Sequence, residues 1–135
     1  LHVWRIDRKK HGRMGGYPTR IKSISWDGKG NALATGGADG IIIWPFRGKD
    51  GPIGQIAEQI PLKPREIITA LAWHPKDDMI AAGTDKGSLL LARRDGATLP
   101  LTQPLGHSVT TLAWSQDAKA LAFGSDQGAL GLVRF

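Results

Sequence analysis

The stretch Ile68-Thr-Ala-Leu-Ala-Trp73, with the turn His74-Pro-Lys-Asp-Asp78 and the stretch Met79-Ile-Ala-Ala-Gly83 behind it, decides the fold of this 135-residue chain. Its first, fourth and sixth positions are apolar, and His, Pro and Asp then supply a tight turn. The apolar pattern of Ile68 to Trp73 recurs from Ile21 to Trp26 and from Val109 to Trp114. The tryptophans that end the three stretches are 47 and 41 residues apart. The sequence is therefore an internal repeat of short strands.

Each repeat continues into a third and a fourth strand, and the four strands of a repeat are called a, b, c and d in chain order. An Asp- and Gly-containing turn ends every second strand, and third apolar strands are expected at 41–46, 88–92 and 129–135. Weaker fourth strands are expected at about 53–61 and 97–103. The 18 Gly and 8 Pro are spread along the chain, which suits many strands joined by many turns.

This pattern resembles the WD-repeat β-propeller family, whose period is about 40 to 45 residues. The resemblance implies an all-β fold, an incomplete β-propeller of about three four-stranded antiparallel blades. Residues 1–20 are expected to form strands c and d of a preceding blade, since Leu1-His-Val-Trp4 is similar to the end of a third strand. Two blades are expected at 21–62 and 63–104, and strands a to c of a last blade at 105–135.

The blade count implies an incomplete ring. Propellers typically close with 4 to 8 blades, so this chain is expected to form only part of a ring. The last blade stops after strand c, and the resemblance implies such a stop in a carboxyl-terminal blade, so we expect a carboxyl-terminal half-propeller. We expect its apolar blade faces to be covered by another half or by a second copy of the chain, which would make a homodimer.

The family often ties a blade together with a His before strand a, a hydroxyl in strand b, an Asp in the b–c turn and a Trp ending strand c. The first repeat offers Thr35, Asp39 and Trp44, and the second keeps only Asp85. The third offers His107 and Asp126. We therefore expect Asp39, Asp85, His107 and Asp126 to hold turns and blades, His107 through a hydrogen bond within its blade. Cohesion is expected to rest more on apolar packing, with Trp26, Trp73 and Trp114 buried.

The residues indicate no catalytic site. A phosphate-binding Gly-x4-Gly-Lys-Ser/Thr loop is absent, there is no Cys, and the four histidines lack metal-ligand spacing. We expect no enzyme activity, no cofactor and no metal. The longest apolar runs fall short of the roughly 18 residues of a membrane helix, so no membrane partner is expected.

The net charge of +6 belongs to one end of the chain. Residues 1–22 carry seven cations against Asp7, whereas the remainder carries eleven cations and eleven acids. Tyr17 is the one aromatic side chain between Arg5 and Lys22, so stacking platforms for bases are missing. A solvated connection explains this segment better than nucleic-acid contact, which stays open as the alternative.

The resemblance implies a non-catalytic scaffold that binds a protein or peptide partner on the face formed by the d–a and b–c loops. A nucleic-acid-binding module acting through the basic amino-terminal segment is the alternative function. The residues that the resemblance places on the partner-binding face are Arg20, Ala38, Arg65, Glu66, Thr84, Ser108 and Gln127.

Overall fold

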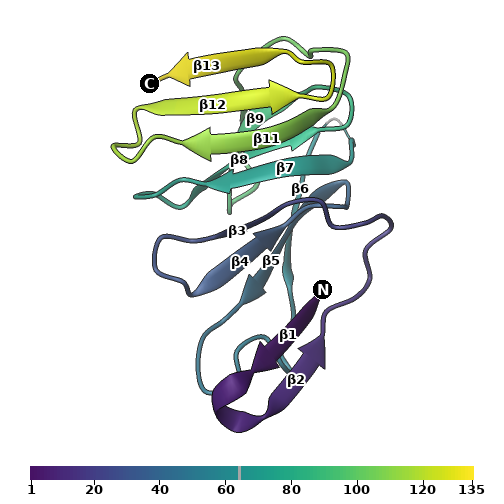
Figure 1. Ribbon diagram of the computed structural model, residues 1–135, viewed down its shortest axis with the longest axis vertical. Helices are drawn as coiled ribbons and strands as arrows, with labels where there is room; N and C mark the ends of the chain where they lie inside the picture. The colour runs from purple at the N-terminus through teal and green to yellow at the C-terminus, as the bar shows by residue number, and fades with distance from the viewer. Residues whose placement is uncertain (64) are drawn as a thin grey trace.

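The computed structural model describes residues 1–63 and 65–135 and consists of antiparallel β-sheets. One short 3₁₀ helix, η1 (Ile6–Arg8), interrupts the strands, and the described residues contain no α-helix. Four sheets follow one another in chain order along the long axis of the molecule (Figure 1). The expected all-β, incomplete propeller is confirmed.

Every sheet is a meander in which consecutive strands pair. The hairpin sheet contains β1 (His2–Arg5) and β2 (Lys10–Arg13). Sheet I contains β3 (Ile24–Trp26), β4 (Ala32–Thr35), β5 (Gly40–Pro45) and β6 (Glu58–Pro61). Sheet II contains β7 (Ile68–Trp73), β8 (Met79–Thr84), β9 (Leu89–Arg93) and β10 (Thr98–Pro100). Sheet III contains β11 (Val109–Trp114), β12 (Ala120–Ser125) and β13 (Leu130–Arg134).

Strand β3 is shorter than the expected strand at 21–26 because its partner strand leaves the ladder early. Gly36 N–H still donates to Ser23, but Gly37 N–H donates at 2.9 Å to the carbonyl of Ile68 in sheet II. The carbonyl of Ala38 in turn accepts from Ile68 N–H at 2.9 Å. The turn after β4 is thus bonded to the next sheet, which is a tertiary contact that strand propensity does not contain.

The core lies between the sheets. Sheets I and II enclose one apolar cluster, which includes Ile41, Ile43, Leu71 and Trp73. Sheets II and III enclose a second cluster. All six residues of β7 are buried, because sheet II is covered on both faces. Alternate residues of its strands therefore pack against sheet I and against sheet III.

The strand-to-strand register shows which rows pack where. The cross-strand row Ala72–Ala81–Leu91 of sheet II faces sheet III, whose row Leu112–Phe123 packs against it. Close approach of these two sheets also requires Gly83, because a Cβ there would lie 2.5 Å from a methyl group of Val109.

Side chains also connect the sheets to backbone atoms of their neighbours. Ser23 and Ser25 on the edge of sheet I accept hydrogen bonds from the amides of Leu71 and Trp73, each at 2.8 Å. Thr69 Oγ1 donates to the Val109 carbonyl at 2.6 Å. These contacts satisfy backbone groups of β7 and β11 that no strand pairs within their own sheets.

The expectation that all three repeated tryptophans are buried is wrong for Trp26. Trp73 packs on sheet I and is 6% exposed, and Trp114 is partly buried against sheet II. Trp26 is 48% exposed and contacts Phe46 edge-on at 4.5 Å between ring centroids. Trp73 and Trp114 belong to the apolar clusters between sheets, whereas neither of these clusters includes Trp26.

We expect Ser25→Ala to destabilise the chain by about 1–3 kcal/mol, because the buried amide of Trp73 would lose its acceptor. Urea unfolding followed by circular dichroism measures this change. The control is Thr98→Ala on the exposed strand β10, which removes a hydroxyl that bonds no backbone group among the described residues. Equal effects of the two substitutions would contradict the role assigned to Ser25.

Candidate functional site

The face predicted to bind a partner lies where the d–a connections and the b–c turns meet at one edge of the sheets. Backbone hydrogen bonds join neighbouring sheets along this edge, as in Gly37 to Ile68 and Leu105 N–H to Gly87 at 3.0 Å. Arg20, Arg65 and Gln127 are exposed on it, and Ser108 is partly exposed. These four residues are called the loop face below.

Three other residues predicted for this face turn inward. Ala38 and Thr84 are 6% and 2% exposed. The Thr84 hydroxyl donates to Glu66 Oε2 at 2.5 Å and accepts from Ser88 N–H at 3.0 Å. Ala38, Thr84 and Glu66 therefore build the turns that support the loop face, and the first two are closed to a partner.

The residues predicted to hold turns occupy different places. Asp85 accepts a hydrogen bond from Ile67 N–H at 3.0 Å, which fixes the entry to β7. Asp126 bonds Ser108 through its backbone N–H at 3.0 Å. Asp39 lies partly buried in the turn before β5 and lines a hollow of about 300 Å³ with Tyr17 and Trp44.

The hydrogen bond expected of His107 within its blade is missing. Its Nδ1 is buried and has no hydrogen-bond partner in the part of the chain that is described. On strand β12, Phe123 occupies the position at which Thr35 supplies a hydroxyl in sheet I.

The polar link of sheet I contains Tyr17, which the sequence reasoning did not include. Trp44 Nε1–H donates to the Tyr17 oxygen at 2.6 Å, and Thr35 Oγ1–H donates to the Ile42 carbonyl at 3.1 Å. The Tyr17 hydroxyl lies 2.5 Å from Thr35 Oγ1 and so donates its own proton to it. Tyr17 lies before β3, in the segment where the family often has a His. The sequence signal for it was that the first repeat has Thr35 and Trp44 but no His to bond them.

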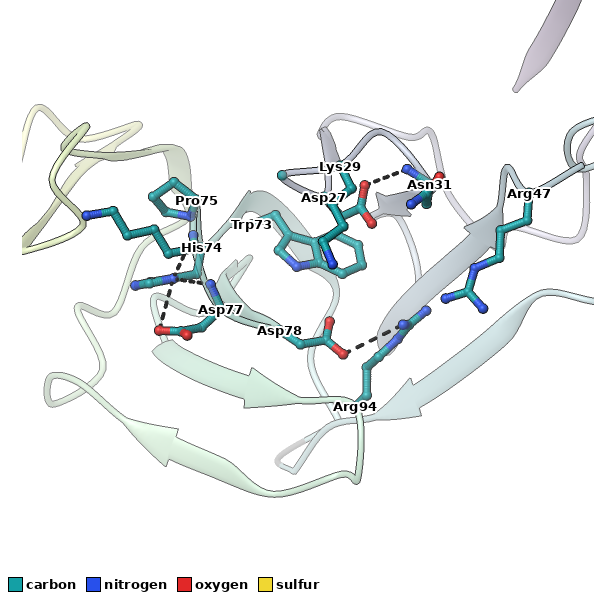
Figure 2. Close-up of a pocket in the computed structure, with 12 residues that line it drawn as sticks. Asp27, Lys29, Asn31, Arg47, Trp73, His74, Pro75, Asp77, Asp78 and Arg94 are labelled. Atoms are coloured by element: carbon teal, nitrogen blue, oxygen red, sulfur yellow. Dashed lines mark hydrogen bonds and ion pairs between the residues drawn. The ribbon is translucent and has the colours of Figure 1, made fainter.

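A hollow of about 580 Å³ lies at the opposite edge of the sheets (Figure 2). Its walls are the turn 27–31 of sheet I, the turn 74–78 of sheet II, and the side chains of Trp73, Arg47 and Arg94. A second hollow of about 330 Å³ shares Asn31, Arg47 and Arg94 with it. We call the two together the turn groove.

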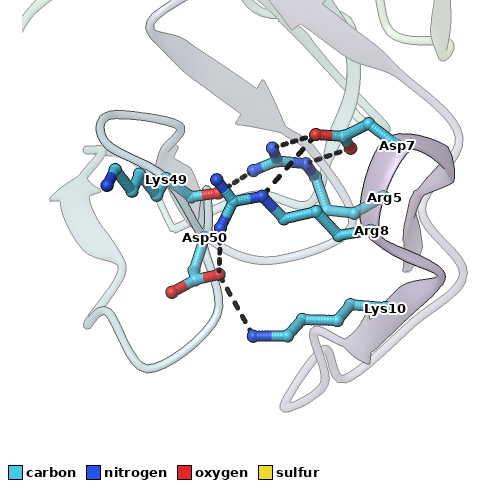
Figure 3. Close-up of polar contacts among 6 residues, drawn as sticks. All are labelled: Arg5, Asp7, Arg8, Lys10, Lys49 and Asp50. Atoms are coloured by element: carbon cyan, nitrogen blue, oxygen red, sulfur yellow. Dashed lines mark hydrogen bonds and ion pairs between the residues drawn. The ribbon is translucent and has the colours of Figure 1, made fainter.

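The basic amino-terminal segment is partly neutralised by acids (Figure 3). Arg5 bonds Asp7 through two nitrogens, at 2.9 and 3.1 Å, which lowers the pKa of Asp7 below its ordinary value. Arg8 and Lys10 both lie near Asp50, at 3.9 and 3.5 Å. These exposed pairs contribute little stability, but they join the hairpin sheet to the 47–54 connection. Nucleic-acid contact through this segment stays a prediction.

Two further features that bear on function are possible metal-ligand clusters and membrane-spanning helices. Within residues 1–63 and 65–135, no three His, Asp or Glu side chains are grouped so that they could hold a metal ion. No helix of this described part is long and apolar enough to span a membrane.

The stacked meander sheets define a partial β-propeller, and comparison with known proteins identifies its family. Residues 9–44 match the family described as WD domain, G-beta repeat, and residues 71–135 match the anaphase-promoting complex subunit 4 WD40 domain. The chain belongs to the WD-repeat family, as the resemblance of its repeats indicated.

A curated relative is the ribosome biogenesis protein ERB1 of the fungus Chaetomium globosum. The two sequences are 31% identical over 96 residues, which is 70% of this chain. The chain spans only 10% of the length of that relative.

Tyr17→Phe should lower the free energy of unfolding by about 1–2 kcal/mol, since the Trp44 indole N–H would lose its acceptor in a partly buried site. Urea titration of Tyr17→Phe, Trp44→Phe and the double variant measures the coupling. We expect the double variant to lose less stability than the sum of the single variants. Simple additivity would contradict the link.

Proposed function

We propose that this chain is a non-catalytic protein-interaction scaffold that binds a protein or peptide partner through the loop face. WD-repeat domains commonly mediate protein–protein interaction, and proteins of this family are generally non-enzymatic scaffolds. The observation that carries the proposal is the set of backbone bonds between sheets along the loop face. The bonds from Gly37 to Ile68 and from Leu105 to Gly87 hold the connections of successive sheets as one surface. Because these connections are already fixed, binding a partner would cost little conformational entropy of the loops.

The exposed residues of the loop face carry the chemistry of recognition. Arg20 and Arg65 present two cations, and Gln127 presents an amide, none of which forms an ion pair or side-chain hydrogen bond among the described residues. Arginine is enriched at protein interfaces, where its planar group binds carboxylates and stacks on aromatic rings. An acidic or aromatic patch on a partner therefore fits this face.

Further sheets are proposed to cover the two ends of the stack. The outward row Ala113–Ala122–Leu132 of sheet III repeats the row Ala72–Ala81–Leu91, on which sheet III itself packs. Leu132 is 55% exposed, and Ile24 and Trp26 are similarly exposed on sheet I. Apolar faces of this kind favour association. The occupant is either another half of a propeller or a second copy of the chain.

The Arg20→Glu, Arg65→Glu double variant tests the loop face. We expect it to keep its free energy of unfolding within about 0.5 kcal/mol, because both side chains are exposed. We expect capture of protein partners, quantified by mass spectrometry after affinity purification, to fall about tenfold. Lys49→Glu with Arg93→Glu, at two exposed cations on the opposite edge of the sheets, is the charge-matched control. A double variant that keeps both stability and partner capture would count against the loop face.

The solution mass of the chain tests the covering of its ends. Light scattering over a concentration series should give a mass above the 14.5 kDa of a single chain if a second copy covers the apolar faces. Leu132→Glu should then return the mass to that of one chain, whereas Leu99→Glu on exposed strand β10 should not. A single-chain mass at every concentration would remove the homodimer and leave another propeller half as the occupant.

A further inference from the structure

The turn groove lies at the edge of sheets I and II opposite the loop face, and the proposed function does not use it. In a meander the a–b turns and the strand c ends share one edge, while the b–c turns lie at the other. The groove therefore brings together Asp27–Asn31, His74–Asp78, Arg47 and Arg94, which lie far apart in the sequence.

Arg94 is the fixed cation of the groove. Its guanidinium lies over the Trp73 ring, 5.8 Å from the centroid. Its terminal nitrogens approach Glu58 at 3.3 Å and Asp78 at 3.6 Å. With only 29% of its side chain exposed, Arg94 is held in one orientation by two carboxylates and an aromatic ring.

Arg47 is a cation without a counter-ion. No carboxylate of the described residues lies within 4 Å of its guanidinium. The Lys29 ammonium of the groove likewise has no ion pair or side-chain hydrogen bond among these residues, whereas the acids of the groove have partners. Asp27 accepts from Asn31 N–H at 2.7 Å, and Lys76 donates to the Asp117 carbonyl at 3.1 Å. The guanidinium of Arg47 extends toward that of Arg94 (Figure 2), and both line the two hollows of the groove.

We propose that the turn groove binds an acidic peptide, with one glutamate or aspartate carboxylate held by Arg47 beside Arg94. A carboxylate accepts two parallel hydrogen bonds from a guanidinium, and its charge would offset the repulsion between the two cations. The indole of Trp73 supplies an apolar wall for the methylene groups of a glutamate side chain. The volume of about 580 Å³ is sufficient for a short peptide segment.

The charges of the groove favour a peptide over a nucleic acid. Asp77, Asp78 and Glu58 line it beside the cations. A nucleic acid brings a phosphate at every nucleotide, so neighbouring phosphates would meet these carboxylates. A peptide can place one carboxylate at Arg47 and uncharged groups next to the acids.

The test is fluorescence anisotropy of a short peptide of alanine and serine that carries one central glutamate, blocked ends and an uncharged fluorophore, at about 50 mM salt. The wild-type chain should bind it and should not bind the counterpart with glutamine in place of glutamate. Arg47→Gln should weaken binding about tenfold. Arg47→Lys should weaken it several-fold, because the ammonium group lacks the fork of the guanidinium.

Arg93→Gln is the matched control, because it also removes one positive charge. Arg93 is exposed, precedes Arg94 in the sequence and pairs with Asp95. It should weaken binding by less than about twofold. Equal losses for Arg47→Gln and Arg93→Gln would overturn the proposal, as would no binding by the wild type. Tighter, Arg47-dependent binding of a single-stranded oligonucleotide would also overturn it. Arg20→Glu and Arg65→Glu should leave peptide binding unchanged, so this proposal and that of the loop face fail separately.

Discussion

Burial of sheet II on both faces is the constraint on which the rest of this structure depends. Alternate side chains of β7, β8 and β9 pack against sheet I and sheet III, so sheet II joins the two apolar clusters. Burial on both sides leaves the outer backbone groups of β7 without water. Ser23 and Ser25 of sheet I supply acceptors for two of its amides, and the Ala72 carbonyl accepts the indole N–H of Trp114 at 3.0 Å. Apolar packing and polar satisfaction thus depend on the same inter-sheet distance.

The polar links within the sheets differ from one repeat to the next. Sheet I uses Tyr17 between Trp44 and Thr35, whereas sheet II joins Glu66 to Thr84 before β9. Sheet III has no equivalent link to His107 among the described residues. A buried polar group needs a hydrogen-bond partner but not a particular one. Sheets I and II therefore bond these groups with different side chains, and Nδ1 of His107 in the third repeat has no partner among the described residues.

The two edges of the stack offer different chemistry for recognition. The loop face presents exposed cations on connections that are bonded from sheet to sheet. The turn groove is a recess with mixed charge, where Arg94 is held by carboxylates and Arg47 is not. Under the two proposals, one partner binds the loop face and another binds the turn groove through a carboxylate, and sheets I and II position both edges.

The sequence by itself determined the repeat, the strand order and the all-β class, because alternation of apolar residues and the turn residues Gly, Pro and Asp act locally. It also placed Arg20, Arg65 and Gln127 in exposed connections, although that they bind a partner stays a prediction. Only the tertiary structure decided that Ala38 and Thr84 are buried, that Trp26 is exposed and that Tyr17 bonds Trp44. Those outcomes depend on which sheet stands beside each residue. The turn groove arises in the same way, since Arg47 and Arg94 meet only when sheets I and II stack.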